Sequence, residues 1–382
     1  MTILEVTTES FFMYVHVQPI AEYLRQQGHD VVLVCSEDPS EAGQSFVPQL
    51  RARGFDVVVI PMRRTISLWA DVKAIFLLYR YLCTRRFDIV HVHTAKAGVI
   101  GRVAAWFAGV PTIIYTSHGF PFHPYLNSWR VWLYALLEKS TARLCDVITV
   151  VSDAMRSRGL EFRVAPQQKI RVICNGVDTA RFDPVKYEEE RLIVRREWGL
   201  PPDAVVLGTL CRLVPDKGID CLLRVIAILV SGYQNVHCVI CGDGSLRLSL
   251  KDMVEDLNIS RHVTFTGYRQ DTPRILAAFD VFILPTRREG FGRSFVEAMS
   301  MEVPVLGSRI SPLTEIIVEG KTGLLSEVDT PEAFAAAASR LVVSKDLRCQ
   351  MGKAGRAHVI ENFGQRRMCE AYERLFREYH DQ

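Results

Sequence analysis

Residues 281–299 read VFILPTRREGFGRSFVEAM, and the pattern within them changes from strand to loop to helix. The apolar run Val281–Leu284 is typical of a short buried strand, and a helical pattern begins near Ser294. Between them, Gly290 and Gly292 permit the backbone to approach a ligand closely. The free N–H groups at the start of such a helix favour an anion. This segment therefore predicts an anion site at a strand end.

Two carboxylates of this loop have more than one interpretation. Ser294 and Glu297 have the spacing of a helix capping box, which alone would account for both residues. Glu289 could be an exposed loop carboxylate or a group that contacts a ligand. Local rules leave these alternatives open.

An earlier loop has similar chemistry. The expected strand Val205–Leu210 is followed by CRLVPDKG, residues 211–218, and then by a helical pattern. Arg212 and Lys217 thus lie near a helix N-terminus, where the helix dipole disfavours cations. A bound diphosphate would resolve that conflict, although Asp216 could offset part of it instead.

Strand-like and helix-like runs alternate along the whole chain, which indicates an α/β fold with parallel sheets covered by helices on both faces. The expected strands are Ile3–Val6, Val31–Cys35, Val57–Ile60, Ile89–His93, Thr112–Ser117 and Val147–Val151, then Val205–Leu210, Val236–Cys241, His262–Thr266, Val281–Leu284 and Val303–Leu306. A short strand and turn around Ile173–Asp178 separates the two series.

The chain length of 382 residues suits two domains, because single cores seldom exceed ~250 to 300 residues. We predict an N-terminal domain over residues 1–178 and a C-terminal domain over 179–364. The amphipathic helix expected from Gln365 has no further strand to serve. We therefore expect residues 365–382 to cross back onto the first domain.

Composition excludes several classes of protein. No stretch reaches the ~20 uncharged apolar residues of a membrane span, and the N-terminus lacks the features of a signal peptide, so we expect a cytoplasmic protein. The ten cysteines are scattered, and Cys238 and Cys241 lie on opposite faces of one strand, so no metal or redox site is predicted. The net charge of +3 is too modest for a nucleic-acid binder.

One basic segment has two interpretations. Between residues 51 and 180 the chain has 18 Lys and Arg against 8 Asp and Glu. The cations that surround the apolar run Ala74–Leu82 are Arg63, Arg64, Lys73, Arg80, Arg85 and Arg86. This pattern fits peripheral contact with an anionic membrane, or a core helix with a solvated basic face.

Taken together, the motifs resemble glycosyltransferase family 4, and the resemblance covers almost the whole chain. In the second half, Glu289 and Glu297 lie eight apart within EGFGRSFVEAM, downstream of RLVPDKG. Further matching segments are NGVD (175–178), GDGSLR (242–247), EII (315–317) and GKTG (320–323). In the first half, HVHTAKAG (91–98) and SHGFPFH (117–123) resemble the subgroup that builds capsular and other surface polysaccharides, often on lipid carriers.

This resemblance implies the GT-B fold, in which two Rossmann-like parallel-sheet domains face each other across a cleft, the C-terminal one binding the nucleotide-sugar donor and the N-terminal one serving the acceptor. It implies a catalytic set of Glu289, His118, Arg212 and Lys217. It also implies a donor-binding set of Arg212, Lys217, Gly244, Arg269, Glu289, Phe291, Gly292, Arg293, Ser294 and Glu297.

Within these sets the resemblance implies distinct tasks. Arg212 and Lys217 would bind the diphosphate, with help from the backbone N–H groups of Arg293 and Ser294. Glu297 would hold the ribose, and Glu289, Phe291 and Gly292 would contact the sugar. The backbone near Arg269 would read the base, and His118 would lie over the sugar and leaving phosphate.

Two segments of the first half carry further expectations. His91 and His93 alternate within a strand, and we expect at most one of them to face the cleft. Many relatives have glycines after the first strand, but here the segment is TTESFFMYVH, residues 7–16. We expect this aromatic loop to shape the acceptor site.

The function implied is a retaining, metal-independent transfer of a hexose, from a UDP-sugar rather than a GDP-sugar, to a saccharide acceptor that is lipid-linked. No cofactor is expected, and no D-x-D motif for a metal occurs in the chain. A peripheral place on the inner face of the cytoplasmic membrane would suit such an acceptor. The alternatives are a nicotinamide-dependent oxidoreductase, which the missing GxGxxG weakens, an inactive sugar-nucleotide binder and a sugar-nucleotide epimerase on the same fold.

Overall fold

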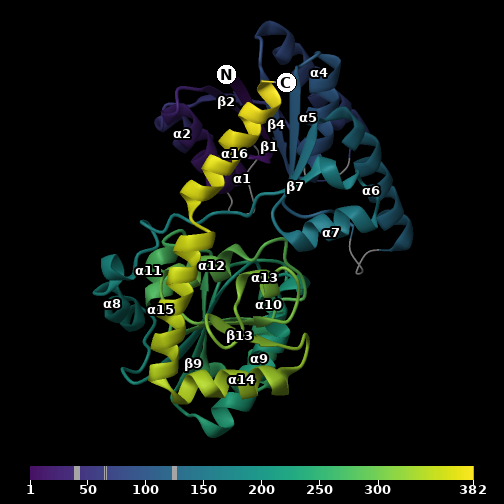
Figure 1. Cartoon of the computed structure of the whole chain (residues 1–382). Coiled ribbons are helices and arrows are strands. Elements are labelled where there is room, and N and C mark those ends of the chain that lie inside the picture. The colour runs from purple at the N-terminus through teal and green to yellow at the C-terminus, as the bar shows by residue number, and fades with distance from the viewer. Residues whose placement is uncertain (38–43, 64, 66, 123–126, 382) are drawn as a thin grey trace. The chain divides into compact units, whose positions relative to one another are not determined.

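The computed structural model describes residues 1–37, 44–63, 65, 67–122 and 127–381. The chain divides into two compact units (Figure 1). Unit 1 comprises Met1–Asn175 and Arg366–Gln382, and unit 2 comprises Gly176–Gln365.

The described residues of unit 1 form a seven-stranded sheet in the order β3-β2-β1-β4-β5-β6-β7. All its neighbouring strands are parallel. The strands are β1 (Thr2–Glu9), β2 (Asp30–Ser36), β3 (Asp56–Val59), β4 (Ile89–His93), β5 (Thr112–Ser117), β6 (Val147–Val150) and β7 (Ile170–Val172). Most central strand residues are buried, as expected of a parallel sheet covered on both faces.

Helices connect these strands and cover the sheet. They are α1 (Ser10–Phe12), α2 (Gln18–Gln26), α3 (Val47–Ala52), α4 (Leu68–Thr84), α5 (Ala95–Phe107), α6 (Ser128–Thr141) and α7 (Asp153–Glu161). Because parallel strands need crossover connections, the chain passes through these helices on its way back to the start of the next strand.

The last helix, α16 (Gln365–His380), belongs to unit 1 from its second residue onward. It lies over the unit 1 sheet as the helix labelled α16 in Figure 1, which ends near the C-terminus. Its residues Met368, Tyr372 and Phe376 recur at helical spacing and are buried in the same core cluster as Ile3 and Leu33. Burial of large side chains of this kind contributes about 1.5 to 3 kcal/mol each, so α16 is an integral part of this unit.

Unit 2 has a six-stranded sheet among its described residues, in the order β10-β9-β8-β11-β12-β13, and every pair is parallel. The strands are β8 (Val205–Leu210), β9 (Val236–Cys241), β10 (Val263–Gly267), β11 (Val281–Leu284), β12 (Val305–Ser308) and β13 (Gly323–Ser326). The chain order reverses between β8 and β11, and the crevice at such a switch point is where open α/β sheets bind ligands.

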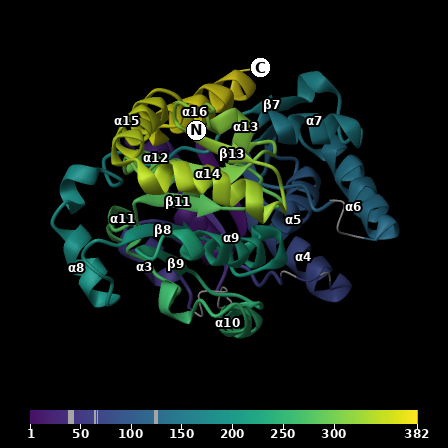
Figure 2. The ribbon, with the colours of Figure 1, turned by 90° about the horizontal axis from the view of Figure 1, so that it is seen from below.

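The helices of unit 2 are α8 (Glu190–Glu197), α9 (Ile219–Gly232), α10 (Arg247–Asp256), α11 (Thr272–Ala277), α12 (Arg293–Ser300), α13 (Leu313–Ile316), α14 (Pro331–Val343) and α15 (Lys345–Asn362). Helices α9 and α14 pack side by side (Figure 2). The α9 face with Leu222, Ile226 and Leu229 is fully buried, as its apolar spacing requires.

Two sequence expectations about elements were wrong. The aromatic segment after β1 is not a loop, because it continues from α1 through a π-helical turn, η1 (Met13–Val17), into α2. Strand β13 was missed altogether. Other strands were displaced by one or two residues, as β12 begins at Val305 rather than Val303, and β7 lies just before the segment expected to contain it.

Candidate functional site

Two strand-end loops of unit 2 are joined to each other at the switch point. Strands β8 and β11 are parallel neighbours, so their carboxyl ends share one edge of the sheet. The backbone N–H of Arg287 donates to the carbonyl of Asp216 at 2.8 Å, and the Thr286 hydroxyl donates to the same carbonyl at 3.0 Å. The loop after β11 is thereby fixed against the loop after β8.

Gly218 permits this close approach. Its φ of +63° lies in the left-handed region, and a Cβ at this position would lie 1.9 Å from the carbonyl oxygen of Pro285. Only glycine avoids both the strain and the collision. Gly218 is also the N-cap of α9, so the cations of the loop stand directly before the start of this helix.

The side chains of Lys217 and Glu289 meet across the two loops. Lys217 Nζ donates to Glu289 Oε1 at 2.5 Å, and these side chains are only 18% and 10% exposed. Two residues 72 positions apart in the chain are thus paired at one strand edge. Arg212 in the same loop is exposed. The structure therefore brings three of the expected catalytic residues to one edge of the unit 2 sheet.

The carboxylate of Asp216 is paired with an arginine of the second loop. Its carboxylate accepts from the Nε and Nη2 groups of Arg288 at 3.0 and 2.6 Å. Arg287 donates to Asp220 and Asp329. Arg287 and Arg288 of the second loop are therefore paired with carboxylates, and these ion pairs help to hold the two loops together.

The predicted capping box at Ser294 and Glu297 is wrong. Helix α12 begins at Arg293, and its N-cap is Gly292 with a φ of 97°. Ser294 therefore lies inside the first turn, two positions beyond the N-cap. Glu297 instead accepts from Arg293 Nε at 2.8 Å. Gly292 therefore occupies the N-cap position of α12, and helix capping does not explain Glu297.

The remaining donor-site residues lie on neighbouring loops of unit 2. Gly244 follows β9, and a Cβ there would lie 2.5 Å from the carbonyl oxygen of Leu213. The guanidinium of Arg269 forms a two-point pair with Asp271 at 2.8 and 2.6 Å. Phe291 is buried against Phe363 with ring centroids 5.7 Å apart, so a sugar could meet residue 291 only through its backbone.

Cys211 is the residue of this edge that most resembles a nucleophile. Burial is the largest cause that raises the pKa of its thiol, to about 12. A thiol with this pKa carries almost no thiolate at neutral pH, and the thiolate is the reactive form. Cys211 therefore has a structural role.

His118 follows β5 at the carboxyl edge of the unit 1 sheet and is half-buried. Its ring lies edge-on to Phe12, with centroids 4.7 Å apart, and 5.8 Å from the ring of His16. Phe12 and His16 stack on each other at 4.3 Å. His118 therefore packs against the aromatic segment that follows β1.

His91 and His93 were expected to alternate within the strand, so that at most one of them faces the cleft, and the expected alternation was wrong. Residues two apart in a strand point to the same face, and both imidazoles contact the carboxylate of Glu5 on β1. Sequence reasoning missed Glu5, which lies in an apolar run. The only signal was a carboxylate at a position where strand periodicity requires burial.

Comparisons with known proteins agree with this geometry. Residues 190–358 match the profile described as "Glycosyl transferases group 1", and residues 13–176 match "Glycosyl transferase 4-like domain". A GDP-mannose-dependent alpha-(1-6)-phosphatidylinositol monomannoside mannosyltransferase of Mycobacterium tuberculosis is 33% identical, over 84% of this chain and 82% of that protein. The chain belongs to glycosyltransferase family 4.

Other relatives agree with this assignment. A UDP-Gal:alpha-D-GlcNAc-diphosphoundecaprenol alpha-1,3-galactosyltransferase of Escherichia coli is 29% identical to this glycosyltransferase, over 90% of this chain and 87% of that protein. The crystal structure of Anabaena HepE with UDP and glucose superposes with a TM-score of 0.85 at 19% identity, and covers 99% of this chain and 100% of that one. The fold is GT-B, and the oxidoreductase and epimerase alternatives are not favoured.

None of the helices in the described ranges has the length and apolarity needed to cross a membrane.

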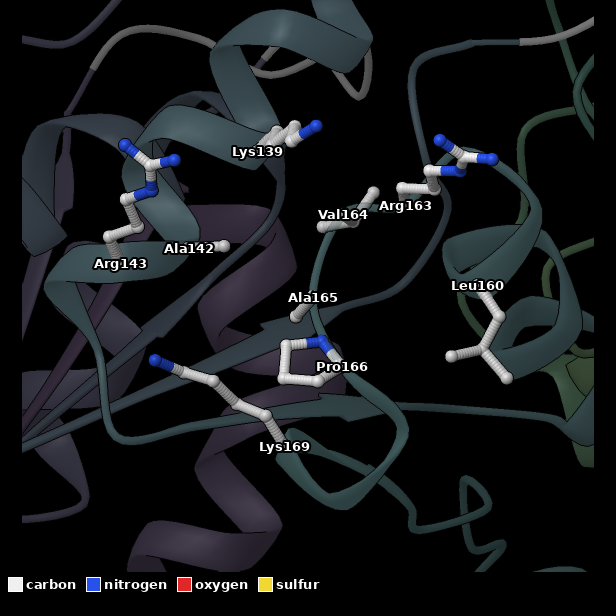
Figure 3. A pocket seen from close by; sticks show the side chains of 9 residues that line it. All are labelled: Lys139, Ala142, Arg143, Leu160, Arg163, Val164, Ala165, Pro166 and Lys169. Carbon is white, nitrogen blue, oxygen red and sulfur yellow. The ribbon is translucent and has the colours of Figure 1, made fainter.

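The glycosyltransferase has a cavity of about 360 Å³ at the surface of unit 1, lined in part by Lys139, Arg143, Arg163 and Lys169 (Figure 3). Arg143 precedes β6 and Lys169 precedes β7, so this cavity lies at the amino ends of the strands. It is therefore at the edge opposite to His118.

Proposed function

We propose that this glycosyltransferase transfers a hexose from a UDP-sugar to a lipid-linked saccharide, with retention of configuration, in the synthesis of a surface polysaccharide. The observation that carries the proposal is the joined pair of loops after β8 and β11. It brings Lys217 and Glu289 together beside the starts of α9 and α12. Two helix N-termini and two cations at one strand edge suit a diphosphate.

The proposed roles follow from this placement. Arg212 and Lys217 bind the diphosphate, together with the backbone N–H groups of Arg293 and Ser294 at the start of α12. Fixed donors of this kind stabilise the charge that develops on the departing phosphate, and they act most strongly where water is excluded. With cations at the leaving group, the reaction needs no divalent metal.

The other residues of the set orient the donor. Glu289 holds a hydroxyl of the sugar, with the backbone of Phe291 and Gly292 beside it, and Glu297 holds the ribose. Gly244 gives the donor access to the backbone, which near Arg269 reads the base. His118 contributes a contact to the sugar and the leaving phosphate. Attack occurs on the face from which the phosphate departs, with a phosphate oxygen as the base.

UDP is the nucleotide favoured by the relatives with the greater coverage. The Escherichia coli relative is named for UDP-Gal and a diphosphoundecaprenol-linked acceptor, and the solved HepE structure contains UDP. The mycobacterial relative is named for GDP-mannose. A lipid carrier on the acceptor is consistent with the surface of unit 1.

The surface of unit 1 exposes large apolar side chains at positions where a solvent-exposed protein surface usually has polar ones. The residues with more than half of their area exposed are Leu68, Trp69, Val72 and Phe76 on α4, Trp106 and Phe107 on α5, and Trp129 and Trp132 on α6. Helix α5 packs against both α4 and α6, and all three lie together in Figure 1. We call this set the aromatic surface.

Cations accompany the aromatic surface, as at a membrane interface. The guanidinium of Arg80 lies 6.0 Å from the ring of Phe76, and that of Arg130 lies 5.2 Å from Trp129. Of the basic residues expected to contribute, Arg85 pairs with Asp30 and Asp56, and Arg64 lies outside the described residues.

The four cations of the cavity in Figure 3 extend this basic character. Lys139 and Arg143 follow the exposed tryptophans along the same helical segment. None of the four cations has an ion-pair partner within the described ranges. We propose that the aromatic surface and these cations hold the enzyme against an anionic membrane, where the lipid-linked acceptor lies.

A donor screen tests the catalytic part of the proposal. The protein is mixed with UDP-glucose, UDP-galactose, UDP-N-acetylhexosamines, GDP-mannose and NADH in turn, and its thermal stability is recorded. A UDP-sugar should raise the melting temperature by mass action. Product mass and anomeric configuration are then determined with lipid-diphosphate saccharides. Stabilisation by NADH alone, or a product of inverted configuration, would contradict the proposal.

Sedimentation with vesicles tests the membrane part separately. The wild type should sediment with anionic vesicles at low salt, and a Trp69→Gln/Trp132→Gln variant should not. Leu248→Gln is the matched control, because Leu248 on α10 of unit 2 is 76% exposed and lies outside the aromatic surface. Equal sedimentation of all three proteins would contradict the membrane contact and leave the donor assignment unaffected.

A further inference from the structure

A charged carboxylate lies at the centre of the unit 1 sheet. The side chains of Glu5, His91 and His93 are 0% exposed. His91 Nδ1 lies 3.0 Å from Glu5 Oε2, and His93 Nε2 lies 2.7 Å from the same oxygen. An unpaired buried charge would cost several kcal/mol. The two imidazole contacts therefore stabilise the ionised Glu5 at this buried position.

The contacts determine which nitrogen of each ring carries a proton. An ionised carboxylate only accepts, so His91 donates from Nδ1 and His93 donates from Nε2. His91 Nε2 then accepts from the hydroxyl of Thr116, at 2.6 Å. The Thr116 oxygen in turn has Thr149 and Tyr372 as neighbours. We call the contacts from Glu5 through His91 to Thr116 the His91 arm. Every hydrogen-bond donor in this arm has an acceptor.

The other arm leads to His118. His93 Nδ1 lies 3.2 Å from His118 Nε2. Because His93 uses its N–H on Glu5, its Nδ1 carries a lone pair and must accept from His118 Nε2–H. The other nitrogen of His118 is Nδ1, a buried atom that has a lone pair in the neutral ring and an N–H in the protonated ring.

We propose that Glu5 and His93 are positioning residues that fix the tautomer of His118 through the chain Glu5–His93–His118. The proposal deepens the role given above to His118 and rests on that proposed function. Neither Glu5 nor His93 needs to touch the substrate. Their effect is on the ring that does, because His93 Nδ1 accepts from His118 Nε2–H as long as Glu5 keeps the proton of His93 on Nε2.

The pKa values of the two buried groups are consistent with this arrangement. Burial alone would raise the pKa of Glu5, but the two imidazoles lower it to about 2. Burial and the neighbouring His91 lower the pKa of His93 to about 4. At neutral pH Glu5 is therefore ionised and His93 is neutral.

The same three residues could in principle hold a metal ion, because their ligand atoms lie within 4.8 Å of one another. The carboxylate–imidazole distances, however, are those of N–H···O hydrogen bonds, and a proton occupies each ligand nitrogen that faces Glu5. The hydrogen-bond chain also accounts for all three residues and continues to His118. Metal analysis is therefore one arm of the test.

The decisive variant is Glu5→Gln, which changes the polarity of the chain without removing an atom. The amide oxygen of Gln can stay on His91 Nδ1 while its N–H₂ donates to His93 Nε2, because in the opposite orientation the buried N–H₂ would face no acceptor among the described residues. His93 Nε2 then accepts, and the His93 proton moves to Nδ1. His118 Nε2 must then accept, which leaves only a neutral ring with Nδ1–H. Loss of the charge-assisted contact should lower kcat by at least about 10-fold, with little change in the KM for the donor.

Thr116→Val is the matched control for damage to a buried polar network. It removes the contacts of the Thr116 hydroxyl with His91, Thr149 and Tyr372 and leaves the arm to His118 intact. Its melting temperature should fall as much as that of Glu5→Gln, with kcat within about 3-fold of the wild type. An equal fall of kcat in both variants would mean that Glu5 acts only on stability.

A double-mutant cycle and a spectrum complete the test. If Glu5 acts through His118, then Glu5→Gln should have no further effect on kcat in a His118→Asn background, and additive effects would overturn the proposal. The ¹⁵N spectrum of histidine-labelled protein should show His118 protonated at Nε2 in the wild type and at Nδ1 in Glu5→Gln. Its signal is assigned from its loss in His118→Asn.

The outcomes separate the two proposals. An unchanged His118 tautomer in Glu5→Gln, or a stoichiometric metal ion that a chelator removes, would overturn the chain. The expected change of tautomer in a protein that transfers no sugar from any donor would overturn the proposed function and support the chain.

Discussion

Replacement of Lys217 by methionine is the sharpest test of the donor site. Methionine keeps most of the length and apolar volume of the side chain and removes its charge. In the structure this charge is paired with Glu289 at 2.5 Å, in a site where the two side chains are 18% and 10% exposed. The change therefore removes a cation from the proposed diphosphate site and leaves a carboxylate there without this partner.

The expected loss of affinity follows from Coulomb's law. Two unit charges about 4 Å apart interact by ~4 kcal/mol at an effective dielectric constant of ~20, and by ~1 kcal/mol in bulk water. Because Lys217 is mostly buried, the higher figure is the closer one. Each ~1.4 kcal/mol is a factor of ten, so UDP should bind about 10²- to 10³-fold more weakly.

Stability and binding should respond differently to a second change. Lys217→Met alone should lower the free energy of unfolding by about 1 to 3 kcal/mol, the cost of a buried polar group without its partner. Adding Glu289→Gln removes that charge, so the double variant should recover stability. It should also bind UDP better than Lys217→Met, because a carboxylate no longer opposes the diphosphate, but it should not transfer sugar.

The assays are calorimetric titration with UDP, urea unfolding and product formation. Arg309→Met is the control, since Arg309 pairs with Glu319 and Glu327 on an exposed surface of unit 2 and such pairs contribute little. If Lys217→Met bound UDP within a factor of three of the wild type, the diphosphate would not lie at this strand edge, and the assignment of Arg212, Lys217 and Glu289 would have to be abandoned.

Three further predictions concern single features. Transfer should continue in excess EDTA, and strict dependence on added magnesium in the same assay would contradict the metal-free scheme. Gly218→Ala should unfold at a clearly lower urea concentration than the wild type, because the new Cβ meets the carbonyl of Pro285 at 1.9 Å; an unchanged midpoint would mean that the loops are not joined. The lowered pKa of His93, about 4, should remove stability as the pH falls from ~6.5 through 4. The lowered pKa of Glu5, about 2, should remove more below ~4.5. Urea midpoints measured from pH 7 to pH 4 should therefore decline less in His93→Leu than in the wild type.

Much of the fold follows from local pattern. Runs such as Val205–Leu210 and Val236–Cys241 were predicted to the residue, because parallel strands buried on both faces are apolar throughout. Strand β13, Gly323–Ser326, was missed because it is short and begins with a glycine. Its strand conformation comes from pairing with β12 rather than from its own composition. Tertiary context therefore decided what propensity could not.

The error at Ser294 has a specific cause. The sequence fits a capping box, but a glycine two residues earlier adopts a positive φ and starts the helix first. A sequence pattern for a helix start considers only residues that are neighbours in the chain. Here the start is also set by packing, since a Cβ on Gly292 would lie 2.7 Å from the Leu313 side chain. The backbone approach that requires glycine determined where the helix begins.

Sequence reasoning found the joined loops because each follows its own strand, and topology rules bring such loops together. It could not find Glu5 in the same way. The position of Glu5 in the run TILEVTTE carries no signal of its partners. These partners lie on β4, 86 and 88 positions further along the chain. Only the strand order, in which β4 is next to β1, places the two histidines beside it.

The two units thus bring charge to a strand edge by different physical means. In unit 2, glycines allow two loops to approach each other, and Lys217 and Glu289 pair where the loops meet. In unit 1, a carboxylate buried in the sheet contacts His93, which in turn contacts His118 at the strand end. Changes in the unit 2 loops should therefore alter affinity for the donor. Changes at Glu5 should alter turnover at unchanged affinity, because the group that they affect is a ring orientation and not a contact with the nucleotide.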